Sequence, residues 1–231
     1  MTDIIKSMDG MREVNVFMAK VAQECGKNEE CVNYMKEVIN QGRPLSYNER
    51  NLISAAYKGI VGPLRDSLRL LQEDNHDYDV AGAIIEISEL LSSKCDEVIN
   101  LIRSTLLPSV TEPEVRIFYI KMVADYYRYK WEGTPDKNRP EVAQKCRESY
   151  QEAMTLANTS LPTYHPLKLG LSLNFAVFIY EILNETSEAY ELASTAYTEA
   201  GSGINQLSPE SKEEASHTME LLNENIQLWH Q

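Results

Sequence analysis

Apolar residues recur every three to four positions along most of the chain, with polar residues between them. This period places the apolar side chains on one face of an α-helix, so the pattern predicts amphipathic helices from end to end. Two helix starts carry their own chemistry. Ser46 with Glu49, and Thr111 with Glu114, have the spacing of capping boxes, in which each side chain bonds the backbone of the other residue.

Prolines and glycines mark further boundaries. Pro140, Pro166 and Pro209 suit the first turn of a helix, and Gly42 and Gly201 are placed to end helices in the left-handed conformation. Together these signals predict helices over residues 11–26, 28–41, 46–72, 78–107, 112–132, 140–158, 166–184, 187–200 and 208–229. Because the connections are short, successive helices should be antiparallel neighbours. We therefore expect an all-α fold, a layered array of helical hairpins forming one domain over residues 1–231. Residues 1–10 would be an N-terminal extension of this domain, either disordered or helical.

Composition and charge limit the classes of partner that the protein could bind. The 231 residues are 43% hydrophobic and 25% charged, as in ordinary globular proteins, and the formal net charge is −13. Such a surface repels nucleic acid and anionic lipid, so we expect neither as a partner, and an anionic ligand would need a local cluster of cations. No apolar run has the length of a membrane span, and residues 1–17 lack the apolar block of a signal peptide. We expect a cytoplasmic protein.

The cysteines give no sign of a metal or redox centre. Cys25, Cys31, Cys95 and Cys146 show no C-x2-C pairing and no histidine at metal-ligand spacing. We interpret them as reduced thiols, mostly in the core, and expect no metal and no cofactor.

One polar stripe lies in the segment KMVADYYRY, residues 121–129. Lys121, Asp125, Arg128 and Tyr129 share a helix face, where Asp125 could hold the guanidinium of Arg128 and Tyr129 adds a phenolic donor. This set suits a tetrahedral dianion. Taken alone, an Asp and an Arg three residues apart are more often a solvated surface pair of small energy.

Three other stripes accompany it. Lys58 and Arg65 lie two turns apart on one helix face and could form a second wall of the same anion site. Two later helices mix apolar residues with an asparagine, whose amide both donates and accepts, as the backbone of an extended peptide requires. The alternative is that these stripes are core and that Trp229 is a packing anchor. The later stripes include Leu173, Asn174, Val177, Glu181, Leu221, Asn225 and Trp229.

At these residues the sequence resembles the 14-3-3 family. Four segments carry the likeness, in order: RNLISAAYKGIVG (50–62), FYIKMVADYYRY (118–129), HPLKLGLSLNFAVFIYEILN (165–184) and MELLNENIQLW (219–229). The resemblance implies nine antiparallel helices in a cup-shaped array, with one amphipathic groove per protomer. It also implies a cytoplasmic protein, able to shuttle to the nucleus, that dimerises with itself or a paralogue and binds phosphoserine or phosphothreonine segments of client proteins.

The resemblance implies roles for individual residues. Phosphate would be bound by Lys58, Arg65, Arg128 and Tyr129, and the ligand main chain by Asn174 and Asn225. Further groove residues would be Lys121, Leu173, Val177, Glu181, Leu221 and Trp229. For the dimer interface we expect an apolar face on the terminal helices, made by Val16, Val21, Cys25, Ile84, Ile87 and Leu91.

The sequence departs from the family pattern at several positions. Pro63 lies between Lys58 and Arg65, where a proline removes a helical hydrogen bond and tends to kink the axis. Val123 replaces a frequent lysine, and the segment 72–82 is short. These changes bear on ligand preference and on dimerisation.

The leading interpretation is a non-enzymatic adaptor that clamps phosphorylated segments. Without phosphate, Lys58, Arg65 and Arg128 would face each other without a counter-ion, and their repulsion would discriminate against unphosphorylated segments. The alternative is a helical scaffold that binds peptides without phosphate dependence. A helical phosphatase is a third hypothesis, but the sequence has no Cys-x5-Arg loop, P-loop or carboxylate metal cluster.

Overall fold

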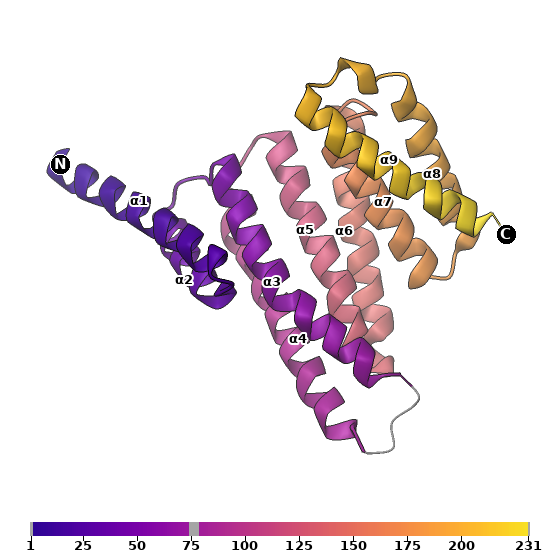
Figure 1. The fold of residues 1–231 in the computed structure, drawn as a ribbon, viewed down its shortest axis with the longest axis horizontal. Helices are drawn as coiled ribbons and strands as arrows, with labels where there is room; N and C mark the ends of the chain where they lie inside the picture. Colours follow the sequence, from indigo (N-terminus) through magenta and orange to yellow (C-terminus); the bar gives the residue numbers. More distant parts are fainter. Residues whose placement is uncertain (1, 74–78, 231) are drawn as a thin grey trace. The chain divides into compact units, whose positions relative to one another are not determined.

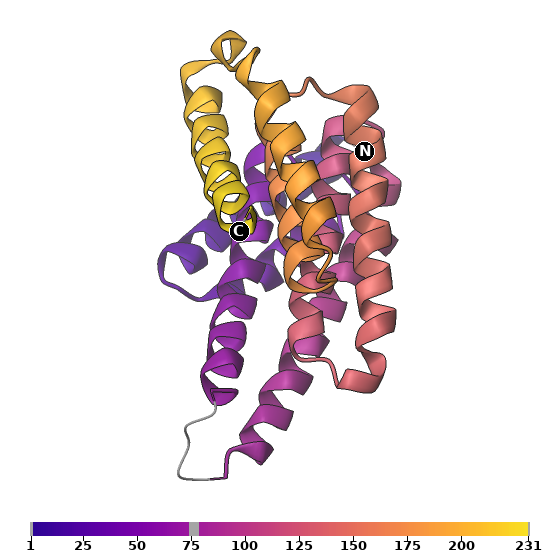
Figure 2. The ribbon, with the colours of Figure 1, turned by 90° about the vertical axis from the view of Figure 1, so that its right-hand side faces the viewer.

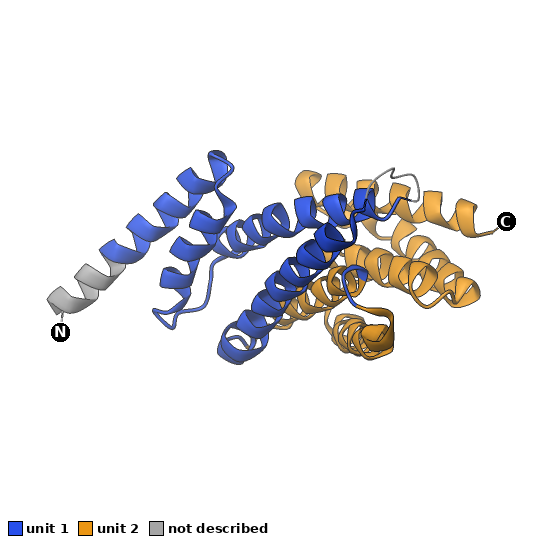
Figure 3. Cartoon of the chain, turned by 90° about the horizontal axis from the view of Figure 1, so that it is seen from below, with its two compact units in different colours: residues 1–110, 132–134 blue, residues 111–131, 135–231 orange. Residues whose placement is uncertain are grey.

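The computed structural model describes residues 2–73 and 79–230, with side chains from residue 10 onward. Residues 74–78, within the short segment noted above, lie outside the described residues. The chain divides into two compact units (Figure 3): unit 1 comprises residues 1–110 and 132–134, and unit 2 comprises residues 111–131 and 135–231. The single domain expected from the sequence stays a prediction.

Nine α-helices lie within the described ranges (Figure 1), and no strand is found there, which confirms the all-α class. Their bounds are α1 Thr2–Glu24, α2 Asn28–Ile39, α3 Tyr47–Leu71, α4 Ala81–Leu101, α5 Pro113–Glu132, α6 Arg139–Ser160, α7 Pro166–Glu181, α8 Thr186–Gly201 and α9 Pro209–Trp229. A π-helical turn and three short 3-10 helices join them: η1 Ile102–Leu106, η2 Leu107–Ser109, η3 Asp136–Asn138 and η4 Ile204–Gln206.

Most predicted boundary signals are confirmed. The Ser46 hydroxyl accepts a hydrogen bond from the backbone N–H of Glu49, and the Glu49 carboxylate accepts one from the backbone N–H of Ser46, so the capping box is complete. The three prolines occupy the first or second position of α6, α7 and α9. Gly42 has φ +72°, the left-handed conformation expected after α2.

Other boundaries differ from the prediction. Gly201 is the last residue of α8 and does not have a positive φ, so its predicted role as a left-handed cap is wrong. α1 begins at Thr2 rather than at residue 11. The helix predicted to start after Thr111 begins slightly later, since α5 starts at Pro113 and the carbonyl of Glu112 accepts a hydrogen bond from the N–H of Arg116. α3 runs through Pro63 without interruption, so the proline does not end the helix.

In unit 1, α1 packs on α2, α2 on α3, and α3 on α4, and apolar side chains are buried on each of these helices. The carboxylate of Glu97 on α4 links three helices, since it accepts hydrogen bonds from Lys36 of α2 and Tyr57 of α3. Burial alone would raise the pKa of Glu97, but these donors and the charge of Lys94 hold it below its usual value. The α2–α4 layer is therefore joined by an ionised group as well as by apolar contact.

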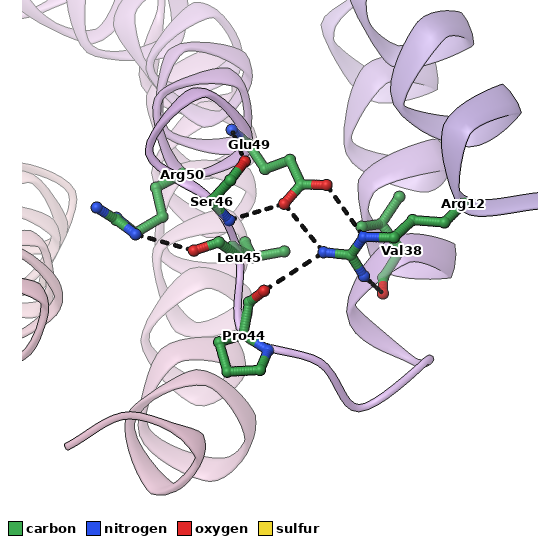
Figure 4. A network of polar contacts seen from close by, with 7 residues as sticks. All are labelled: Arg12, Val38, Pro44, Leu45, Ser46, Glu49 and Arg50. Atoms are coloured by element: carbon green, nitrogen blue, oxygen red, sulfur yellow. Dashed lines mark hydrogen bonds and ion pairs between the residues drawn. The ribbon is translucent and has the colours of Figure 1, made fainter. Parts of the chain in front are cut away.

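A second polar network joins α1 to the start of α3 (Figure 4). The Arg12 guanidinium donates from Nε to Glu49 Oε1 at 3.1 Å and from Nη2 to Glu49 Oε2 at 2.9 Å. It also donates to the carbonyls of Val38 and Pro44. The Glu49 carboxylate thus completes the cap of α3 and neutralises Arg12, which fixes α1 against the α2–α3 connection.

In unit 2, α7, α8 and α9 lie side by side (Figure 2), and α6 packs on α7. Tyr150 of α6 stacks on Phe175 of α7 with ring centroids 5.2 Å apart, and the Tyr180 and Trp229 rings stack at 4.8 Å between α7 and α9. The Cys146 thiol donates to the carbonyl of Ala124 on α5 at 3.3 Å. Aromatic contacts therefore set the positions of α6, α7 and α9.

Candidate functional site

The predicted polar stripe on α5 forms a network that extends to two other helices of unit 2. Lys121 Nζ donates to Asp125 Oδ2 at 2.7 Å, one turn away on α5. Asp125 Oδ1 accepts from the Tyr150 hydroxyl of α6 at 2.6 Å and from Asn174 Nδ2 of α7 at 2.9 Å. One carboxylate thus holds residues from α5, α6 and α7.

The expected direct bond from Asp125 to Arg128 is not formed, and this corrects the sequence interpretation. The three donors above occupy the carboxylate, and Arg128 acts on it through charge. Asp125 is 6% exposed, so burial raises its pKa, but the charges of Lys121 and Arg128 and the hydrogen bonds lower it below the ordinary value. Asp125 is therefore ionised at neutral pH.

Arg128 and Tyr129 lie next to each other at this network. The Arg128 Cζ atom is 5.0 Å from the centroid of the Tyr129 ring, within cation–π range. Burial opposes the charged form of Arg128, but the oxygens of Tyr150 and Asp125 raise its pKa above the ordinary value. Its Nε–H is buried and has no acceptor within the described part of the chain. Arg128 is therefore a half-buried side chain that stays charged beside the Tyr129 ring.

The other predicted cations lie on α3, in unit 1. Lys58 is exposed, whereas Arg65 is 16% exposed and is held by Glu132, 17% exposed, through Nε–Oε2 and Nη2–Oε1 distances of 3.0 and 2.6 Å. Arg69 also donates to Glu132 Oε1, at 2.9 Å. The expectation that these cations lack counter-ions in the free protein is wrong for Arg65, because the carboxylate of Glu132 neutralises its charge.

The stripes on α7 and α9 are half-buried for most of their length. Leu173, Asn174, Val177, Leu221 and Asn225 are all of intermediate exposure, while Glu181 is exposed and Trp229 is buried against Tyr180. Half-buried positions of mixed polarity suit a ligand-facing surface better than the interior of a core. Trp229 packs within unit 2, as the alternative interpretation expected.

The predicted dimer residues fall on α1 and α4 of unit 1. Val21 and Cys25 are exposed, and Val16, Ile84 and Ile87 are half-buried. Leu91 is fully buried, where it packs beside Gly133, so its assignment to an interface is corrected. Other apolar side chains extend the exposed α1 and α4 faces, namely Met11, Val14, Phe17, Ile85 and Leu90. A cavity of about 330 Å³ opens beside them, lined by Arg12, Glu13, Val16, Phe17, Lys20 and Glu49.

Three residues of these networks were missed in the sequence. Glu132 follows Arg128 by one turn on α5, but its partners are on α3, and spacing along one helix gives no signal for that contact. Tyr150 likewise contacts Asp125 only because α6 packs on α5. Arg69 had a local signal, since it lies one turn after Arg65.

Across the described residues, no three His, Cys, Asp or Glu side chains come together as metal ligands. None of the helices there is both long and apolar enough to cross a bilayer.

Comparison with known proteins decides the family. Residues 18–230 match the family model described as "14-3-3 protein". The chain belongs to the 14-3-3 family. It is 41% identical to 14-3-3 protein 2 of Entamoeba histolytica over 228 residues, which cover 94% of this chain and 95% of that protein. It is 40% identical to 14-3-3-like protein A of Glycine max over 233 residues, 96% of this chain and 91% of that protein.

Membership in the 14-3-3 family accounts for the broad function. 14-3-3 proteins are non-catalytic adaptors that bind client proteins and form dimers. The all-α fold and the protein-binding adaptor role expected from the sequence are therefore confirmed at the level of the family.

Proposed function

We propose that this 14-3-3 chain binds phosphoserine or phosphothreonine segments of client proteins, and that Lys58, Arg65, Arg128 and Tyr129 bind the phosphate. The observation that carries the proposal is Arg128, a half-buried cation that lies against the Tyr129 ring and whose pKa is raised above the ordinary value by neighbouring oxygens. A phosphate brings about −1.5 to −2 charges and three acceptor oxygens, which match such a cation.

Charge supports the same conclusion. Lys121 and Arg128 outnumber Asp125 in unit 2, and Lys58, Arg65 and Arg69 outnumber Glu132 in unit 1, so each set keeps an excess of positive charge. The whole chain carries −13, so these sets are local exceptions. The acidic remainder of the surface would repel nonspecific anions, which favours a specific one.

The source of discrimination differs from that expected from the sequence. Glu132 neutralises part of the cationic charge in unit 1, and Asp125 neutralises part of it in unit 2, so neither set of cations lacks a counter-ion in the free protein. A serine hydroxyl lacks the charge needed to bind the remaining cations, whereas each charge-assisted hydrogen bond to phosphate contributes about 1.5–3 kcal/mol. Discrimination thus comes mainly from attraction to the phosphate.

The client segment itself would lie along α7 and α9. Asn174 and Asn225 would bind its main chain, and Lys121, Leu173, Val177, Glu181, Leu221 and Trp229 would line the groove. A dimer, with itself or a paralogue, would hold two such segments at once and so increase the apparent affinity for doubly phosphorylated clients. The exposed apolar faces of α1 and α4 support this assembly.

Fluorescence anisotropy with a phosphoserine peptide and its unphosphorylated twin tests the proposal. We expect at least tenfold preference for the phosphopeptide, about 1.4 kcal/mol. Arg128→Lys keeps the charge but removes Nε and the planar fork, so it should lose most of this preference, and Lys58→Glu should lose all of it. Lys212→Glu is the control, since it reverses one exposed charge on α9. Equal binding of both peptides by the wild type would instead support the phosphate-independent scaffold.

A further inference from the structure

The buried carboxylate of Asp125 is the centre of a network that contains a proposed ligand residue, Asn174, and two proposed ligand cations. It accepts three hydrogen bonds, from Lys121, Tyr150 and Asn174, at 2.6–2.9 Å. We propose that Asp125 is a positioning residue, which turns the Asn174 amide so that its carbonyl oxygen receives a main-chain N–H of the bound segment. This inference rests on the proposed function.

The chemistry of the contact fixes the orientation of the amide. An ionised carboxylate only accepts hydrogen bonds, so the group of Asn174 that faces Asp125 Oδ1 must be its NH2. Turning the amide by half a rotation would bring two oxygens together and break the 2.9 Å bond. The Asn174 carbonyl oxygen is therefore directed away from Asp125, which leaves it to accept from a ligand.

The orientation depends on Asp125 being both ionised and immobile. Its pKa is held below the ordinary value, because the charges of Lys121 and Arg128 and the hydrogen bonds outweigh the effect of burial. The Tyr150 ring is fully buried and stacks on Phe175, which fixes the hydroxyl that bonds the same oxygen, Oδ1. Asn174 is thus bonded to a group that has little freedom to move.

The same network places Asn174 in fixed relation to Arg128. Both act on Asp125, one through a hydrogen bond and the other through charge, and all three residues belong to unit 2. A phosphate on Arg128 and a main-chain amide on Asn174 would then be positioned by a single carboxylate. Asp125 itself touches neither, so its contribution is to geometry.

The test uses the phosphopeptide and a set of analogues, each with one main-chain N–H replaced by N–CH3. In the wild type, we expect N-methylation at one position to weaken binding at least tenfold. In Asn174→Ala this penalty should fall to within threefold, which identifies the position. Asp125→Leu has a similar size but no acceptor for the Asn174 amide, so the same penalty should also fall to within threefold. Lys212→Glu is the control, because it changes an exposed residue of α9 that does not contact Asp125, and it should retain the penalty.

The results separate positioning from other roles. If Asp125→Leu keeps the full N-methyl penalty, or simply binds every peptide more tightly because one negative charge is gone, Asp125 is only a counter-ion and the inference fails. If Asn174→Ala keeps every penalty, Asn174 does not bind the main chain and the inference fails as well. A wild type that binds the phosphorylated and unphosphorylated peptides equally refutes the proposed function instead, and the inference with it.

A second variant keeps the inference testable where Asp125→Leu does not fold. Asn174→Asp changes a half-buried position and places two carboxyl groups together, so the new side chain must be protonated to donate to Asp125. Its phosphopeptide affinity relative to wild type should therefore rise at least threefold as the pH falls from about 7.5 to 5.5. The ratio cancels the titration of the phosphate itself. If the ratio of the two affinities does not change with pH, the orientation of the side chain at position 174 does not depend on Asp125.

Discussion

The network between α1 and α3 gives the sharpest stability prediction. Arg12→Met removes the guanidinium but keeps a long apolar side chain, so the loss is mainly that of its polar contacts. Arg12 and Glu49 are 13% and 11% exposed, and two parallel hydrogen bonds of 2.9 and 3.1 Å join them. The substitution leaves the Glu49 carboxylate without its cation at the first turn of α3.

The expected magnitude follows from burial. Removing one partner of a fully buried ion pair costs about 3–5 kcal/mol, and an exposed pair contributes under about 1 kcal/mol. The Arg12–Glu49 pair lies near the buried limit but keeps some exposure, and Glu49 retains the N–H of Ser46 at 2.7 Å. We therefore expect Arg12→Met to lower the free energy of unfolding by about 2–3 kcal/mol. Arg12→Lys keeps the charge without the fork and should cost about 1 kcal/mol.

The loss should depend on pH in a definite direction. Burial raises the pKa of Glu49, but the hydrogen bonds from Ser46 and Arg12 and the charge of Arg12 lower it below its usual value. A carboxyl group with a lowered folded pKa contributes stability above its unfolded pKa, about 4.3, and loses it as the pH falls through the folded value. The difference between wild type and Arg12→Met should therefore be full at pH 7 and shrink below about pH 4.

Urea unfolding at one protein concentration, followed by circular dichroism, measures these differences. Hydrogen exchange should place the lost protection in α1 and the start of α3. Lys20→Met is the control, since it removes the same charge from an exposed position of α1 and should change stability by less than about 0.5 kcal/mol. An Arg12→Met protein as stable as Lys20→Met would refute the reasoning, because the hydrogen bonds would then contribute nothing.

Two further predictions concern the surface and the core. At low micromolar concentration the protein should sediment with about twice the chain mass of 26.3 kDa. Val21→Lys, on the exposed face of α1, should shift the equilibrium toward the monomer. A wild type that stays monomeric contradicts the proposed dimer. In the folded protein at pH 8, Cys31 and Cys146 should react with a disulfide reagent far more slowly than in urea, since burial raises the pKa of Cys31 to about 11 and that of Cys146 still further. Mass spectrometry after brief labelling checks this, and rapid labelling of Cys146 in the folded protein would disprove it.

What the sequence determined is local. The Ser46–Glu49 box, the prolines at helix starts and the shared face of Lys121 and Asp125 all depend on spacing within about one turn, and all are found in the structure. These features could be predicted because helix geometry alone fixes which residues meet at that spacing. Gly201 shows the limit even of local signals, since glycine permits a left-handed cap but does not require one.

What the tertiary structure decided is which helix faces meet. Asp125 and Arg128 had the spacing of a pair, yet the carboxylate bonds Tyr150 and Asn174, which lie 25 and 49 residues further along the chain. Arg65 was expected without a counter-ion, but the end of α5 supplies Glu132. The physical reason is the same in both cases: a helix determines the face on which a side chain lies, and only packing between helices determines its partner.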